Sequence, residues 1–326
     1  MSNHPYANLS PDLVMDAVES LGLLSDQRVF ALNSYENRVY QVGIEEDAPL
    51  IAKFYRPQRW SRAAILEEHE FTLELQAHDL SVIAPLNFND QTLHHFEGFD
   101  FALFPRQGGY APEIEQADTL FRIGRNIGRL HQIGSAKPFA HRRHLSLAVW
   151  AKDSREFLLE HDFIPQSLRE AYATLSQDLI DKMQTRWNNT EFKSIRLHGD
   201  CHLGNILWRD DLAHFVDFDD CLMGPAIQDI WLMLSGDRTQ QTSQLIEFIE
   251  GYEEFYEFDP RQLNLIETLR TLRMMHYAAW LARRWEDPAF PMHFPWFNTE
   301  RYWAEHVLEL REQLAALDEP TLRLAP

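Results

Sequence analysis

The sequence predicts an α+β fold in which a small, sheet-containing lobe precedes a larger and mostly helical lobe. Apolar runs of strand length are concentrated in roughly the first hundred residues, together with helical patterns. After 105–109, where proline and paired glycines interrupt regular structure, the patterns become mostly helical. A chain of 326 residues is long enough to bury the core of one bilobal domain or of two closely packed ones.

The first lobe is expected to cover residues 1–104. A helix should begin at Ser10-Pro11, because serine is a favoured N-cap and proline fits the first helical position. Apolar residues then recur on one helical face until Gly22 ends the pattern. A second helix is expected at 61–78. Strands are expected at 28–32, 38–44, 50–55, 92–96 and 99–104.

The second lobe is expected to cover residues 105–326. Its first helix, at 120–131, carries Gly124 and Gly128, whose spacing allows another element to approach one face closely. Further helices are expected at 147–160, 166–186, 226–234, 244–255, 263–285 and 300–317.

One stretch of this lobe carries residues typical of phosphoryl transfer. Asp200 and Asn205 lie five residues apart, and Asp217 follows a short apolar run. Phosphoryl transfer requires a carboxylate that orients or deprotonates the attacking hydroxyl, and oxygen ligands for the magnesium ions that neutralise the phosphates of ATP. Protein kinases space their catalytic Asp and Asn in the same way. We therefore predict Asp200 and Asp217 as catalytic residues, and Asn205 and Asp217 as ligands of Mg²⁺.

The local pattern brings the two metal ligands together. The apolar runs 205–208 and 212–216 are separated by Arg-Asp-Asp, which predicts a β-hairpin. Asn205 and Asp217 would then lie at the open end of paired strands. His198 is expected to brace the nearby loop, and Asp229 is expected to cap a helix or to anchor that loop.

Two other classes of protein are compatible with parts of this stretch. His198, Asp200, Cys201 and His202 could supply zinc ligands in a hydrolase. However, we find no second cluster at metal-ligand spacing, and amide and carboxylate oxygens suit magnesium better. A nucleotide-dependent binding module without activity is the other alternative. It is less favoured, because every charge needed for transfer is present.

Lys53 is the expected phosphate-binding cation. It lies near the end of an apolar Leu-Ile-Ala-Lys-Phe strand, as does the lysine of the Val-Ala-Ile-Lys pattern in protein kinases. Its ammonium would contact the α- and β-phosphates of ATP and pair with a helix carboxylate that keeps it in position. The alternative is a surface lysine on an edge strand.

Several ordered blocks of the chain resemble the aminoglycoside phosphotransferase and choline kinase branch of the protein-kinase-like fold. These blocks are 32–40, 52–57, 65–69, 197–207 and 287–291. The resemblance extends over nearly the whole chain. It implies a bilobal, kinase-like fold with a small antiparallel sheet in the first lobe and ATP as co-substrate. It also implies a hinge at about 102–108, whose backbone would meet the adenine.

The resemblance also implies further nucleotide-binding residues. Glu68 is the expected partner of Lys53, with Glu67 as the alternative, and the carboxylate that does not pair should face solvent. Ser34 is expected near the phosphates, in the loop 33–37. This loop lacks the glycines that protein kinases carry there, which is a departure from their pattern. Ser34 is also a candidate for autophosphorylation.

Proteins of this fold phosphorylate sugars, amino alcohols, amino acids and proteins. The resemblance is closest to bacterial serine/threonine protein kinases. It therefore implies transfer of the γ-phosphate to serine or threonine hydroxyls of a protein substrate, with a role in stress response. The alternative is a kinase for a small hydroxylated metabolite, such as an amino acid or amino alcohol.

Composition restricts the expected partners and location. The net charge of −20 disfavours binding to nucleic acid or to an anionic membrane surface. We find no apolar run of transmembrane length, and the polar start of the chain lacks a signal-peptide pattern. The two cysteines suit a reducing compartment. We therefore expect a cytoplasmic protein, and we favour a monomer.

Overall fold

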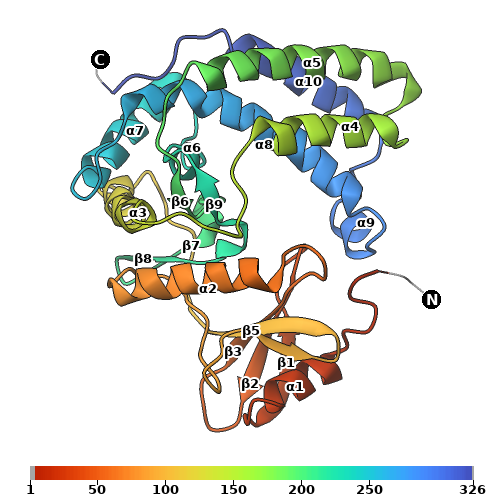
Figure 1. Cartoon of the computed structure of the whole chain (residues 1–326), viewed down its shortest axis with the longest axis vertical. Helices are drawn as coiled ribbons and strands as arrows, with labels where there is room; N and C mark the ends of the chain where they lie inside the picture. Colours follow the sequence, from red (N-terminus) through yellow and green to blue (C-terminus); the bar gives the residue numbers. More distant parts are fainter. Residues whose placement is uncertain (1–3, 325–326) are drawn as a thin grey trace.

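In the computed structural model, which describes residues 4–324, an antiparallel sheet occupies one end of the molecule and a group of helices occupies the other (Figure 1). This arrangement confirms the predicted α+β class. Residues 1–3 and 325–326, at the outer ends of the two expected lobes, lie outside the described residues.

The sheet contains five strands in the order β1-β2-β3-β5-β4. They are β1 (Ser25–Ala31), β2 (Arg38–Ile44), β3 (Leu50–Phe54), β4 (His94–Phe96) and β5 (Phe99–Pro105). In the central strand β3, Lys53 pairs with Val39 on one side and with Ala102 on the other. Because side chains alternate along a strand, Ala52 and Phe54 face the opposite side, where they pack with helix α1 (Pro11–Glu19). The sheet thus presents Lys53 away from α1.

Helix α2 (Arg62–Ala77) lies between the sheet and the helical end of the molecule (Figure 1). Its start agrees with the prediction, because the Ser61 hydroxyl accepts the backbone N–H of Ala64 at 3.2 Å. The middle of the helix buries Glu68, which is 2% exposed. Burial of a carboxylate requires partners, and Glu68 has two cations beside it, Lys53 of β3 and Arg142 of the segment after helix α3 (Thr119–Gly134).

The helical end contains the remaining α-helices and two short antiparallel strand pairs. The helices are α3 (Thr119–Gly134), α4 (Asp153–Glu160), α5 (Gln166–Asn188), α6 (Gln228–Trp231), α7 (Arg238–Tyr252), α8 (Ile266–Arg283), α9 (Ala289–His293) and α10 (Glu300–Ala316), with a π-helical turn (Ala148–Lys152) before α4. The strand pairs are β6 (Ile195–Leu197) with β9 (Leu222–Gly224), and β7 (Ile206–Arg209) with β8 (Leu212–Phe215).

The predicted start of α7 at 244 is wrong. The helix begins at Arg238, where the Asp237 side chain accepts the backbone N–H of Gln240 and the Gln240 side chain accepts that of Asp237. This capping box stabilises a polar first turn that apolar periodicity does not detect.

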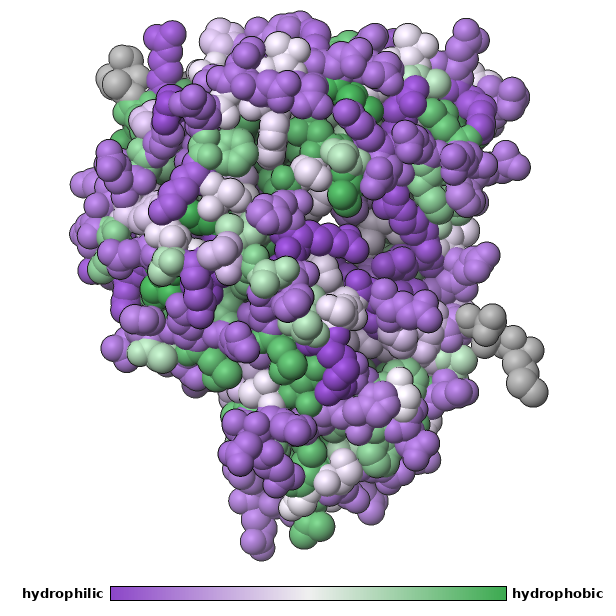
Figure 2. Space-filling model, in the orientation of Figure 1, coloured by the Kyte–Doolittle hydropathy of each residue, from purple (hydrophilic) through white to green (hydrophobic). Residues whose placement is uncertain are grey.

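Within residues 4–324, no helix is both long enough and apolar enough to cross a bilayer. The face of the molecule drawn in Figure 2 is predominantly hydrophilic, with apolar residues in small patches.

Two glycines of α3 permit direct contact between helix backbones, as predicted. A Cβ atom added at Gly124 would overlap the carbonyl oxygen of Phe248 on α7, and one added at Gly128 would overlap that of Tyr252. Because a backbone carbonyl held in a helix cannot move aside easily, both positions exclude larger residues. The contact between α3 and α7 therefore depends on these glycines.

We predict that Gly124→Ala lowers the free energy of unfolding by about 1–3 kcal/mol through overpacking against α7. Helix propensity alone would raise the free energy of unfolding of the alanine variant by about 1 kcal/mol. The sign of the change in this free energy therefore separates overpacking from helix propensity. Urea denaturation measures it, with Gln132→Ala at an exposed position of the same helix as the control. A variant as stable as the wild type would contradict the close-packing argument.

Candidate active site

The β7–β8 hairpin places Asn205 and Asp217 side by side. Ile206 pairs with Phe215 in the antiparallel ladder. The backbone N–H of Val216 then donates to the Asn205 carbonyl oxygen at 3.0 Å, which extends the pairing to the end of the hairpin. The predicted hairpin is therefore confirmed, and the two residues flank its open end.

A buried aspartate holds the loop that carries Asp200. The carboxylate of Asp229 accepts the backbone N–H groups of His198 and Gly199 at 2.7 and 2.8 Å. Gly199 has a φ of +88°, and a Cβ there would overlap the Asp220 carbonyl oxygen, so the position requires glycine. His198 Nε2 donates to the Val216 carbonyl oxygen at 2.9 Å. These contacts agree with the anchoring and bracing predicted for Asp229 and His198.

Asp200 forms an ion pair that the sequence did not reveal. Arg273 Nη1, on α8, lies 2.6 Å from Asp200 Oδ1. Burial by itself raises the pKa of Asp200, but Arg273 and then His202 outweigh burial, and the pKa lies below its ordinary value. Asp200 is therefore an ionised carboxylate with a fixed orientation.

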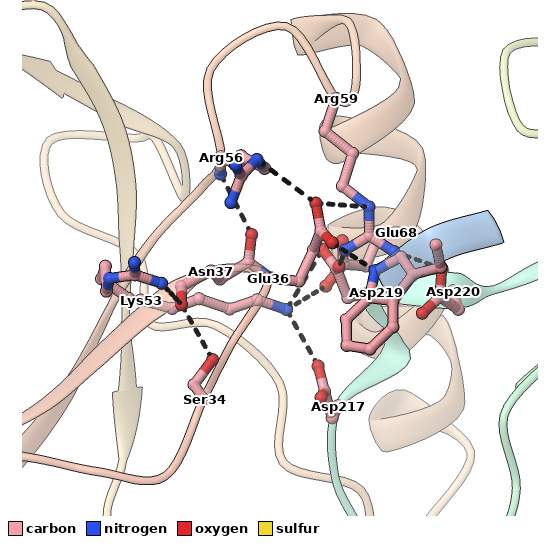
Figure 3. A network of polar contacts seen from close by, with 12 residues as sticks. Ser34, Glu36, Asn37, Lys53, Arg56, Arg59, Glu68, Asp217, Asp219 and Asp220 are labelled. Atoms are coloured by element: carbon pink, nitrogen blue, oxygen red, sulfur yellow. Dashed lines mark hydrogen bonds and ion pairs between the residues drawn. The ribbon is translucent and has the colours of Figure 1, made fainter. Parts of the chain in front are cut away.

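Lys53 lies among three carboxylates (Figure 3). Its Nζ is 3.3 Å from Glu68 Oε1, 3.2 Å from Asp217 Oδ1 and 3.4 Å from Asp219 Oδ1. Burial by itself lowers the pKa of Lys53, but the attraction of Asp219, Glu68 and Asp217 raises it well above its ordinary value. The ammonium therefore stays charged although its side chain is only 8% exposed.

Adjacent residues of α2 have different partners. Glu68, and not Glu67, lies against Lys53, and its other oxygen accepts Arg142 Nη2 at 2.6 Å. Glu67 accepts the backbone N–H groups of Ala140, His141 and Arg142 at 2.5–2.9 Å. Glu67 is half-exposed, and it fixes the 140–142 segment, a role that the sequence did not reveal.

The loop 33–37 is held by side chains from both ends of the molecule. The Ser34 hydroxyl donates to the Asn37 carbonyl oxygen at 3.0 Å. Glu36 Oε2 accepts Trp280 Nε1 at 2.6 Å, and Glu36 Oε1 lies 3.0 Å from Arg284 Nη2. Arg56 Nε lies 3.6 Å from the same Glu36 oxygen. Acidic and polar contacts thus immobilise a loop that has no glycine.

Arg59 links the segment before α2 to the residues that follow Asp217. It forms ion pairs with the carboxylates of Asp219 and Asp220 (Figure 3). Burial raises the pKa of Asp219, but Arg59, Lys53 and Arg142 hold it far below the ordinary value. Asp219 is therefore a buried anion held by ion pairs, and the sequence did not reveal the role of Arg59.

A cavity of about 670 Å³ lies beside these residues. At one end it is lined by Lys53, Asp200, Asn205 and Asp217. Its other walls include apolar side chains, among them Leu32, Val39, Ile51, Phe104, Leu207 and Val216. A cavity that combines apolar walls with a charged end suits a ligand with a flat apolar ring and an anionic tail.

The donor atoms at the charged end fit a magnesium ion. Asn205 Nδ2 donates to the Asp200 carbonyl oxygen at 3.0 Å, which leaves the amide oxygen of Asn205 available. The Asp217 side chain is 57% exposed, and only one of its oxygens contacts Lys53. Among residues 4–324, no three His, Cys, Asp or Glu side chains form a metal-binding group. A metal bound here would thus share two protein oxygens with phosphates and water, as Mg²⁺ commonly does.

These features define a protein-kinase-like fold with a nucleotide-sized cavity. The chain belongs to the phosphotransferase enzyme family, whose sequence profile matches residues 28–266. Stress response kinase A of Shigella flexneri is 46% identical over 98% of this chain and 97% of its own length. Serine/threonine protein kinase RdoA of Salmonella typhimurium is 45% identical over the same shares of the two chains. The predicted family and the predicted class of enzyme, an ATP-dependent phosphotransferase, are confirmed.

Solved structures share the fold at low sequence identity. An amicoumacin kinase in complex with AMP-PNP, Ca²⁺ and Ami superimposes with a TM-score of 0.72 at 20% identity, over 92% of this chain and 93% of its own. A microcompartment-associated aminopropanol kinase gives a TM-score of 0.71 at 17% identity, over 95% of this chain and 99% of its own. The bilobal, kinase-like architecture is therefore shown.

We predict that Arg273→Gln raises the pKa of Asp200, because the variant loses the cation that offsets burial. If Asp200 must be ionised, activity is present above its pKa and is lost as the pH falls through it. The acidic limb of the pH profile of kcat/KM should then move to higher pH. Arg270→Gln, which removes a cation bonded to Glu267 on the same helix, is the control and should leave the limb in place. An unmoved limb in Arg273→Gln would contradict the prediction.

Proposed function

We propose that this kinase transfers the γ-phosphate of ATP to serine or threonine hydroxyls of a protein, with Mg²⁺ as the metal. The supporting observation is the arrangement of Asp200, Asn205, Asp217 and Lys53 around one end of the cavity. The charges of these four side chains match the requirements of phosphoryl transfer. This reaction depends on positioning of the reactants and on neutralisation of the phosphates more than on covalent chemistry by the protein.

Each side chain has a distinct role in this proposal. Lys53, held by Glu68, binds the α- and β-phosphates. Asn205 and Asp217 hold Mg²⁺, which when bound neutralises charge on the phosphate oxygens. Asp200 accepts a hydrogen bond from the acceptor hydroxyl and takes its proton late in the reaction. Ser34 lines the same cavity and reaches a phosphate when its hydroxyl leaves the Asn37 carbonyl.

The nucleotide base is proposed to lie between the apolar walls of the cavity. The backbone of 102–107 then meets the edge of the adenine, and a lobe boundary after residue 104 places this hinge between the two lobes. Phe104 and Gln107, which line the cavity, lie in this segment.

The protein acceptor is supported by the printed name of a relative, Serine/threonine protein kinase RdoA, and a role in stress response by the names of several others. A cytoplasmic location suits the two cysteines, which are buried free thiols. The alternative acceptor is a small hydroxylated metabolite, which is favoured by the structural similarity to an aminopropanol kinase.

We predict that Asp200→Ala abolishes phosphoryl transfer while the protein stays folded. Asp217→Ala should abolish transfer and also weaken binding of magnesium nucleotide, because it removes one of the two proposed metal ligands. Turnover of ATP, calorimetric titration with Mg·AMP-PNP and thermal melting measure the three quantities. Asp162→Ala, at an exposed position, is the control. Turnover like that of the wild type in Asp200→Ala would refute the assignment.

The acceptor class can be determined with labelled ATP and a cell extract. We expect label from the γ-phosphate on polypeptides when wild-type enzyme is added, and none with Asp200→Ala. Treatment with acid and alkali, followed by phosphoamino-acid analysis, identifies the modified residue. Label found only on small molecules would favour the metabolite kinase.

A further inference from the structure

The segment between α8 and α9 carries a buried carboxylate that does not line the cavity. Asp287 is the first residue of the block 287–291, and no residue of this block contributes to the cavity walls. The side chain of Asp287 is only 1% exposed. Helix α9, which follows it, extends from the helical end toward the sheet end of the molecule (Figure 1). A carboxylate buried this deeply must be paired, and its partners come from the sheet end.

Two arginines of the sheet end bind Asp287. Arg38, the first residue of β2, donates from Nη2 to both carboxylate oxygens, at 3.1 and 3.2 Å. Arg56, just after β3, donates from Nη1 to Oδ2 at 3.0 Å. Both guanidinium groups are largely buried, and their central carbons lie 4.5 and 5.9 Å from the ring centre of Tyr6. Because charge-assisted hydrogen bonds shielded from water are strong and well oriented, this contact ties the helical end to the sheet end.

The same two arginines hold the loop 33–37. Arg38 Nη1 donates to the carbonyl oxygens of Tyr35 and Asn37, at 2.9 and 3.3 Å. The backbone N–H of Arg56 donates to Asn37 Oδ1 at 3.0 Å (Figure 3). One carboxylate of the helical end is therefore connected to two residues of the loop through two side chains of the sheet end.

The loop depends on this connection for its place beside the cavity. The Ser34 hydroxyl donates to the Asn37 carbonyl oxygen, which also accepts Arg38, and Ser34 lines the cavity. Among residues 4–324, Glu36 is the only other carboxylate within ion-pair distance of either arginine, at 3.6 Å from Arg56. Loss of the Asp287 charge would leave two buried cations beside one carboxylate. Their repulsion would displace the guanidinium groups, and the loop would lose its fixed conformation.

We propose that Asp287 is a positioning residue of the nucleotide site. It acts through Arg38 and Arg56, and it holds the loop 33–37 in the conformation that receives the phosphates. This inference rests on the proposed function, which places Ser34 of this loop beside the phosphates. Because the free protein already orders the loop, nucleotide binding does not have to supply the free energy of ordering it.

Asp287→Asn tests the proposal with little change in side-chain size. One amide oxygen remains to accept the backbone N–H of Ala289 at the start of α9, a bond of 3.1 Å in the wild type. The amide NH₂ group cannot accept from an arginine, so the variant releases the loop and keeps the start of α9. Glu286→Gln is the matched control, since it removes the same charge one residue earlier, from an exposed side chain that forms no ion pair within residues 4–324.

Hydrogen exchange in the free protein measures the loop itself. We expect the backbone amides of 33–37 to exchange about tenfold faster in Asp287→Asn than in the wild type, because loop opening becomes easier. The amides of β3, which are bonded within the sheet, should exchange at the rate of the wild type. Glu286→Gln should leave both segments unchanged.

Nucleotide binding and turnover distinguish positioning from a general loss of structure. In Asp287→Asn, calorimetric titration should give a dissociation constant about tenfold higher for Mg·AMP-PNP, because binding must now order the loop. The dissociation constant of adenosine should not change, because adenosine has no phosphate for the loop to meet. The KM for ATP should rise by the same factor while kcat stays within about twofold, since the loop regains its conformation once ATP is bound.

A second variant breaks the connection at its other end. Arg38→Gln removes both the bond to Asp287 and the bonds to the loop, so it should give the same separation of Mg·AMP-PNP from adenosine. If Asp287 acts through Arg38, adding Asp287→Asn to Arg38→Gln should raise the dissociation constant less than Asp287→Asn does in the wild type. Equal factors in the two backgrounds would contradict the proposed connection.

The other outcomes separate the positioning role from the proposed function. Unchanged loop exchange in Asp287→Asn overturns the positioning role and leaves the proposed function intact. Faster exchange with unchanged affinity for Mg·AMP-PNP, or an equal loss of affinity for adenosine, also overturns it, because Asp287 would then be only structural. If wild-type protein does not bind Mg·AMP-PNP, the proposed function fails and the positioning role fails with it. Thermal melting checks folding, and Arg38→Gln decides the question if Asp287→Asn does not fold.

Discussion

The architecture of the cleft depends on one buried cation. The Lys53 ammonium is removed from water by the sheet and by α2, and a buried lysine without partners would lose its proton. Glu68, Asp217 and Asp219 prevent this, but each of these carboxylates is itself stabilised only where a cation is near. The charges therefore require that β3, α2 and the segment after the β7–β8 hairpin meet at one point. The same requirement brings the proposed phosphate-binding and metal-binding groups together.

A second layer of ion pairs extends this constraint to the loop over the cavity. Protein kinases cover the phosphates with a glycine-rich loop, whereas this chain has Glu36 in a loop without glycine. Glu36 is bonded to Trp280 and Arg284 of the helical end and lies close to Arg59 of the sheet end. A loop held in this way has fewer conformations to lose when a nucleotide binds, so pre-organisation can replace the flexibility that glycine provides.

Local features could be predicted from the sequence, and distant partners could not. The hairpin, the Ser10 cap of α1 and the close approach at Gly124 each depend on residues that are near in the chain or on the size of one side chain. By contrast, Arg273 and Asp200 are separated by 73 positions, and Trp280 and Glu36 by 244. Apolar periodicity carries no information about which cation meets which carboxylate. The choice of Glu68 over Glu67 came from the resemblance, and the role of Glu67 required the folded position of the 140–142 segment.

Helix α8 connects the parts of the site that a single motif cannot specify. Arg273 fixes Asp200, and Trp280 together with Arg284, at the end of the helix, anchors Glu36. Arg273 and Trp280 lie about two turns apart, so one rigid helix sets the position of the Asp200 carboxylate relative to the loop 33–37.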